Sequence, residues 1–205
     1  MKNHSLLIIV LSLFSVSIFA QKPTLNEDFE SFNISSNPNS GAAYSSSLKW
    51  YRCGDDINLQ VVANPNASGI NKSAKVLKLS RVENPTITVE NANGQTWRGT
   101  TTASYDFSKG NNSIIEFKVI KNIAGKLAMR LFTDESKNYV ELVTPELPAS
   151  KEWQTVKFDF TGRMQFPFTP KAYIMIQLEK NSKVAESQSS ALDIYIDDVK
   201  LIENK

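Results

Sequence analysis

The sequence has almost no histidine and almost no cysteine. Among 205 residues there is one residue of each type, His4 and Cys53. A single cysteine cannot form a disulfide within the chain. The position of the histidine excludes further kinds of chemistry, because His4 lies in a segment that we expect to be removed from the mature chain.

Residues 1–20 read as a secretory signal peptide. Lys2 supplies the positive start, a mostly apolar run extends from Leu6 to Phe19, and Ala20 is a small residue at the cleavage point. The mature chain, 21–205, would be secreted to the periplasm or to the cell exterior. The sequence does not distinguish these two locations. It would contain no histidine, which excludes Ser-His-Asp and Cys-His catalysis and histidine-ligated zinc or copper.

Strong charge of one sign and further long apolar runs are also missing. Without Lys2, the chain has 22 basic and 21 acidic side chains. The basic residues are scattered along the sequence, so they do not form the cluster of positive charge that nucleic-acid binding needs. No second stretch approaches the ~20 apolar residues of a membrane helix. We therefore expect neither a nucleic-acid partner nor membrane insertion, and the oligomeric state stays open.

The apolar residues alternate with polar ones, which is typical of β-strands. In 171–178, Ala172, Ile174, Ile176 and Leu178 fall on one face, and Tyr173, Met175 and Gln177 fall on the other. Similar runs cover 59–62, 76–79, 86–89, 103–107, 114–120, 127–132, 139–143, 153–160 and 192–202. Turn-forming clusters such as NPNASG at 64–69 separate them. Many short strands without helices predict an all-β fold, a two-sheet antiparallel β-sandwich in one domain over 21–205.

The last strand contains an irregularity. Ile194 and Ile196 occupy even positions, whereas Val199 and Leu201 occupy odd ones. One face cannot hold both pairs unless the strand contains an extra residue. We therefore expect a β-bulge at Asp197 and Asp198.

Three segments resemble jelly-roll carbohydrate-binding modules of the galactose-binding-domain-like type. They are LNEDFESF at 25–32, similar to the opening strand; EWQTVKFDFTG at 152–162, similar to a strand opened by Trp; and LDIYIDDVKLIE at 192–203, similar to the closing strand. Residues 64–81 also resemble segments of secreted proteins of Bacteroidetes-type bacteria. The resemblance implies a jelly roll and a secreted binding protein.

The resemblance also implies a structural calcium ion. In such modules an acid of the opening strand and an acid of the closing strand hold Ca²⁺. The matching positions here are Glu30 and Asp197, with Asp28 or Asp198 as helpers. Ca²⁺ takes six to eight oxygen ligands and needs no histidine.

Sugar binding needs flat apolar surfaces bordered by planar donors and acceptors. Trp97 and Arg98 lie in the polar stretch NANGQTWRGTT, where the indole is either an exposed platform or a loop anchor. Trp50 and Tyr51 would point to opposite faces of a strand, so that one is in the core and the other is exposed. The strand faces opposite the core offer Arg130, Tyr139, Glu141, Tyr173 and Gln177. We expect a ligand site among these residues.

These observations favour a secreted protein that binds a polysaccharide or oligosaccharide without catalysis. Two alternatives stay open. An enzyme would have to use carboxylate pairs such as Glu116 with Glu141 or Asp193 with Asp197, as in a glycoside hydrolase, or Tyr139 or Tyr173 as the base of a lyase. The third class is a scaffold domain that binds another protein.

Overall fold

The computed structural model describes residues 25–34, 50–53, 57–81, 83, 98–101, 105–107, 114–132, 139–163, 171–177 and 191–202. The expected signal peptide, Trp97 and the expected strand at 86–89 lie outside the described residues. In the described ranges the chain forms β-strands, and it contains no helix long and apolar enough to cross a membrane.

Strands follow one another along the chain, and every pairing between them is antiparallel. They are β1 (Asn26–Glu27), β2 (Trp50–Cys53), β3 (Ile57–Ala63), β4 (Lys75–Arg81), β5 (Arg98–Thr101), β6 (Tyr105–Asp106), β7 (Ile114–Lys121), β8 (Ala128–Phe132), β9 (Tyr139–Val143), β10 (Ser150–Asp159), β11 (Lys171–Gln177) and β12 (Leu192–Ile202).

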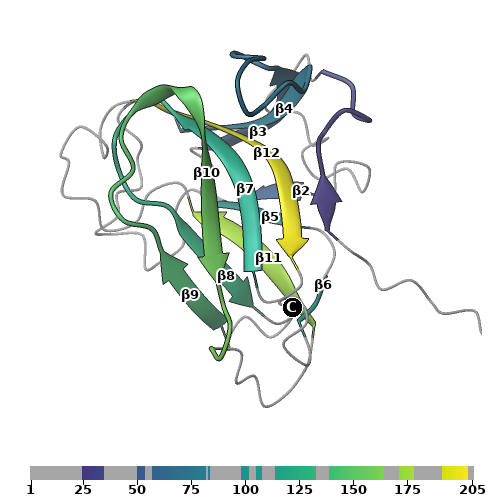
Figure 1. Ribbon diagram of the computed structural model, residues 1–205, viewed down its shortest axis with the longest axis vertical. Coiled ribbons are helices and arrows are strands. Elements are labelled where there is room, and N and C mark those ends of the chain that lie inside the picture. Colours follow the sequence, from purple (N-terminus) through teal and green to yellow (C-terminus); the bar gives the residue numbers. More distant parts are fainter. Residues whose placement is uncertain are drawn as a thin grey trace, which may run out of the picture.

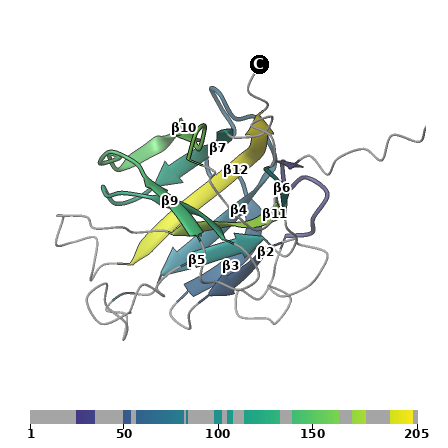
Figure 2. The same ribbon diagram turned by 90° about the horizontal axis from the view of Figure 1, so that it is seen from below.

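Two sheets form the layers of the molecule (Figures 1 and 2). The β12 sheet has the order β10-β7-β12-β4-β3, and β1 also pairs with β12. The β11 sheet has the order β2-β5-β11-β8-β9, and β6 also pairs with β11. This architecture confirms the predicted all-β, two-sheet antiparallel sandwich.

The core lies between the sheets and is made of alternate residues on each strand. On β7 these are Ile115, Phe117 and Val119, and on β11 they include Ile174 and Ile176, all fully buried in one apolar cluster. Burying one such side chain stabilises the fold by about 1.5–3 kcal/mol. The alternation of apolar and polar residues in the sequence therefore indicates which face of each strand is buried.

The stretch around Arg98 differs from the prediction. It looked like part of a polar loop, but Arg98–Thr101 forms β5, which lies between β2 and β11. Its sequence, RGTT, contains no apolar residue and therefore gives no alternation signal. Strand β5 is defined by its backbone pairing with two neighbouring strands, which hydropathy does not show.

The predicted β-bulge in the last strand is confirmed. The pairing of β12 with β7 shifts between Asp197 and Lys200, and Asp198 has a φ of 50°. At the same place the other neighbour of β12 changes, because Ile196 pairs with Leu77 of β4 and Val199 pairs with Glu27 of β1. The extra residue thus lies where β12 exchanges one partner strand for another.

Candidate functional site

The outer face of the β11 sheet brings together most of the predicted ligand-binding residues. The register aligns Tyr139 of β9 with Phe132 of β8 and Tyr173 of β11. A second row aligns Glu141, Arg130 and Met175. A third row pairs Gln177 with Ala128 on one side and with Arg98 on the other. These positions alternate with core residues such as Met129 and Leu131, so they belong to the face away from the core.

Arg130 is fixed by its two neighbours on β9. Its Nε and Nη2 atoms donate hydrogen bonds of 3.1 and 2.8 Å to Oε2 of Glu141. Its guanidinium carbon also lies 3.9 Å from the centre of the Tyr139 ring. A charged, planar group held by two hydrogen bonds and a ring loses little freedom when a ligand binds.

An aromatic pair continues this surface. The Phe132 and Tyr173 rings stack with their centres 5.4 Å apart and their planes at 28°. Phe132 was not among the predicted site residues, although the sequence AMRLF alternates and places Phe132 in phase with Arg130. The alternation was therefore sufficient to find it.

The most exposed part of this face lies over β9, at Tyr139 and Val143. Tyr139 is 51% exposed, whereas Met175 and Gln177 on β11 are only 7% and 4% exposed. A ligand in solution can therefore reach Tyr139 directly but cannot reach the Gln177 side chain in this structure. Of the predicted residues, Tyr139, Arg130, Glu141 and Tyr173 form one group at this end of the sheet.

For the predicted residues of β2 and β5, the structure gives only their pairing with residues of the neighbouring strands. Arg98 pairs with Gln177 and with Cys53, in the same row of the sheet. Trp50 pairs with Thr101 and is out of phase with this row, while Tyr51 pairs with Thr100 and is in phase with Arg130 and Met175. For Trp50, Tyr51 and Arg98 the structure therefore gives the strand and the paired residues.

Three of the four acids predicted to hold a metal make local contacts. Asp28 Oδ1 accepts a hydrogen bond of 3.1 Å from the backbone N–H of Glu30. Glu30 Oε1 accepts hydrogen bonds from the backbone N–H groups of Ala74 and Lys75 at the start of β4. Asp198 forms ion pairs with Lys118 and Lys200.

Asp197 is different, because its carboxyl group is fully buried and neither oxygen makes a hydrogen bond of normal geometry. Burial raises the pKa of Asp197, and the nearby Ser73 hydroxyl, Asp198 backbone and Asn71 side chain lower it by less. The Nδ2 atom of Asn71 is also buried without a hydrogen-bond partner. No group of three or more acidic, cysteine or histidine side chains suited to a metal occurs within the described ranges.

Three of the four carboxylates considered for catalysis, Glu116, Glu141 and Asp193, are already paired with cations, and the fourth, Asp197, is fully buried. Glu116 contacts Lys157 at 2.9 Å, and Asp193 contacts Lys78 at 2.9 Å. Glu116 alternates with buried Ile115 and Phe117, so it faces outward from the β12 sheet, whereas Glu141 faces outward from the β11 sheet. Glu116 and Glu141 therefore do not share a cleft, which a glycosidase carboxylate pair requires.

No protein-family model matches the chain, and a search of curated proteins gives no match. Solved structures with a similar fold include an exo-beta-agarase, at 10% identity, a TM-score of 0.54, and coverage of 89% of this chain and 26% of that chain. Tailspike protein 4 of bacteriophage CBA120 is similar at 14% identity and a TM-score of 0.51, over 82% of this chain and 21% of that chain. The third, TmCBM61 in complex with beta-1,4-galactotriose, has 15% identity and a TM-score of 0.47, over 83% of this chain and 100% of that chain.

Other structural neighbours include carbohydrate-binding modules of families 22, 4 and 29. At these identities the likeness concerns the fold. The likeness to the exo-beta-agarase and to the tailspike protein agrees with the β-sandwich described above.

Proposed function

We propose that the protein is secreted and binds a polysaccharide or oligosaccharide, without catalysis, on the outer face of the β11 sheet. The observation that carries the proposal is the group formed by Tyr139, Arg130 and Glu141, in which an exposed ring lies beside a fixed guanidinium and a carboxylate. The fold shared with part of an exo-beta-agarase is consistent with a glycan ligand.

The chemistry of this group suits a pyranose ring. The C–H face of a sugar packs against an aromatic ring, and its hydroxyl groups exchange hydrogen bonds with planar polar groups at the edge. Tyr139 supplies the exposed ring, and Arg130 with Glu141 supplies donors and acceptors beside it. The stacked Phe132 and Tyr173 rings extend the surface for a second sugar unit.

Affinity electrophoresis in gels that contain a panel of plant, algal and host polysaccharides tests the proposal. Retarded migration in at least one gel is expected, with no release of reducing ends or unsaturated products from that polysaccharide. Migration unchanged in every gel contradicts carbohydrate binding. Product release favours the enzyme alternative, and capture of a protein partner without retention on glycans favours the scaffold alternative.

We also propose a structural Ca²⁺ beside Asp197. A buried carboxyl group whose oxygens lack hydrogen-bond partners fits a cation ligand. Glu30 is the acid suited to complete the site, because it binds the N–H groups of Ala74 and Lys75, next to the 71–73 segment that borders Asp197. Only one Glu30 carboxylate oxygen is used in those bonds. Bound Ca²⁺ would neutralise the buried charge of Asp197 and join the opening segment to the closing strand.

A further inference from the structure

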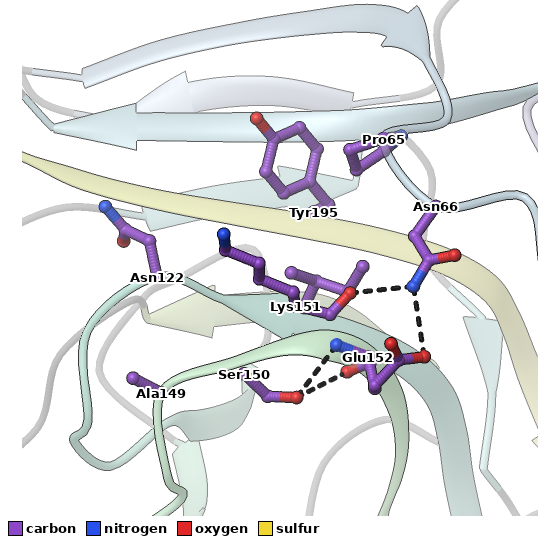
Figure 3. A pocket seen from close by; sticks show the side chains of 9 residues that line it. Pro65, Asn66, Asn122, Ala149, Ser150, Lys151, Glu152 and Tyr195 are labelled. Carbon is purple, nitrogen blue, oxygen red and sulfur yellow. Dashed lines mark hydrogen bonds between the residues drawn. The ribbon is translucent and has the colours of Figure 1, made fainter.

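A hollow lies on the outer face of the other layer, the β12 sheet (Figure 3). Its volume is about 710 Å³, within the ~300–1,000 Å³ typical of ligand sites. The lining residues come from four separate segments and include Pro65, Asn66, Ile120, Asn122, Lys151 and Tyr195. Tyr195 pairs with Ile120 across β12 and β7, so the two side chains lie next to each other on one sheet face.

The rim of the hollow is held by hydrogen bonds. The Asn66 side-chain amide donates to the carbonyl of Lys151 at 2.9 Å and to Oε2 of Glu152 at 3.0 Å. The buried indole of Trp153 donates to the carbonyl of Asn66 at 2.8 Å. These contacts join the loop between β3 and β4 to the first residues of β10, so the shape of the hollow exists before a ligand binds.

A second set of contacts fixes the opposite wall. Asn122 Oδ1 accepts a hydrogen bond of 2.8 Å from the backbone N–H of Asp193, and its amide donates to the carbonyl of Ala191. Lys78 lies 5.4 Å from the centre of the Tyr195 ring, and its charge is balanced by Asp193 at 2.9 Å. The polar groups of this wall are thus mostly engaged within the protein.

Two charged residues line the hollow, Lys151 and Glu152, and they differ in whether their charged group is bound by another side chain. The Lys151 side chain is exposed and extends over the hollow, with its ammonium group between Asn122 and Tyr195 in the view of Figure 3. Within the part of the chain that the structure describes, no carboxylate forms an ion pair with it. Glu152 extends in the other direction in this view, and one of its oxygens is bound to Asn66.

We propose that this hollow is a second glycan site, specific for an acidic sugar residue. The ring of Tyr195 with Pro65 offers an apolar surface for the C–H face of a pyranose, buried Ile120 supports that ring from the neighbouring strand, and Lys151 offers a cation for the carboxylate of the sugar. A neutral sugar would leave the ammonium group without a counter-charge. The site belongs to the β12 sheet, so it does not depend on the group around Tyr139 on the β11 sheet.

The test uses nuclear magnetic resonance titration of the isotope-labelled full chain with two trisaccharides of the same linkage, one of glucuronic acid and one of glucose. The acidic trisaccharide is expected to shift the amide signals of Ile120, Asn122 and Tyr195 and to bind about tenfold more tightly than the neutral one. Lys151→Gln should abolish this preference. Lys157→Gln is the matched control, because Lys157 is an exposed lysine of the same strand, paired with Glu116 away from the hollow, and it should retain the preference.

A second pair of variants distinguishes binding in the hollow of the β12 sheet from binding at the group around Tyr139 on the β11 sheet. Tyr195→Ala should weaken binding of the acidic trisaccharide at least tenfold, with folding checked by the dispersion of the amide spectrum, and Tyr139→Ala should leave the shifts at Ile120 and Asn122 unchanged. Equal affinity for both trisaccharides, the same preference in Lys151→Gln, or shifts confined to the β11 sheet would each overturn the proposal. Polysaccharide binding that is lost only in Tyr139→Ala would overturn this second site and leave the first one standing.

Discussion

The guanidinium carbon of Arg130 lies 3.9 Å from the centre of the Tyr139 ring. The two residues are on neighbouring strands, β8 and β9, and Glu141 holds the same guanidinium with two hydrogen bonds. One face of the ring is thereby covered by a cation, while the side chain as a whole is 51% exposed. A sugar that stacks on Tyr139 must therefore use the uncovered face or the edge of the ring.

Replacement of Tyr139 by alanine tests the importance of this ring. We expect glycan affinity, measured by isothermal titration calorimetry, to fall by about 1–3 kcal/mol, as for the loss of an aromatic anchor. Ile70→Ala is the control, because Ile70 is an apolar residue of similar exposure, 52%, in the loop between β3 and β4. Equal affinity of the two variants would place the ligand elsewhere.

The calcium proposal predicts opposite effects of Asp197→Asn in two buffers. In EDTA the variant should unfold at higher denaturant concentration than the native chain, because it removes an uncompensated buried charge. In excess Ca²⁺ the native chain should gain about 2.7 kcal/mol at 100 times Kd, and the variant should gain nothing. Asp198→Asn should keep the response, since Asp198 is paired with Lys118. An unfolding free energy of the native chain that does not change with Ca²⁺ would exclude the site.

The pKa of Asp197 makes stability depend on pH. Burial raises this pKa in the folded state above its ordinary value of 3.8, so the folded chain binds the proton more tightly than the unfolded chain does. The associated stability is present below pH 3.8 and is lost as the pH rises through the raised pKa. Urea unfolding in EDTA at a series of pH values should show this loss for the native chain and not for Asp197→Asn. Parallel curves for the two proteins would refute the assignment.

Trp153 is predicted to stabilise the loop between β3 and β4 through its indole N–H. Trp153→Phe removes the donor to the Asn66 carbonyl and to Asn64 Oδ1 in a buried place, so we expect a loss of about 1–3 kcal/mol in unfolding free energy. Hydrogen exchange of the Asn71 amide should become faster. Tyr139→Phe changes an exposed ring and should leave both quantities unaltered, so the same loss in both variants would argue against a specific role of Trp153.

Strands with strict alternation were predictable because burial of one face imposes a period of two on the sequence. The expected strands at 139–143 and 192–202 coincide with β9 and β12, including the bulge at Asp197 and Asp198. Strand β5 was not predictable, because RGTT carries no apolar face and is held by backbone pairing on both sides.

For the candidate site, the sequence determined which face of each strand is available for a ligand. Arg130, Tyr139, Glu141 and Tyr173 followed from alternation, because each alternates along its strand with apolar residues that lie in the core or pack against it. Which of them are adjacent was decided by the register between β9, β8 and β11, and that depends on pairing between strands far apart in the chain. The burial of Gln177 and the contact of Arg130 with Tyr139 likewise exist only in the folded chain.

The single cysteine and the alternation of apolar residues determined, by themselves, that this chain forms no internal disulfide and that it folds into two sheets. Only the tertiary structure decided that Asp197 is buried without a hydrogen bond while its neighbour Asp198 is paired with lysines. It also decided that Asn66, Lys151 and Tyr195 border one hollow. The physical reason is that composition and local pattern act along one strand, whereas burial, charge pairing and cavities arise where separate segments meet.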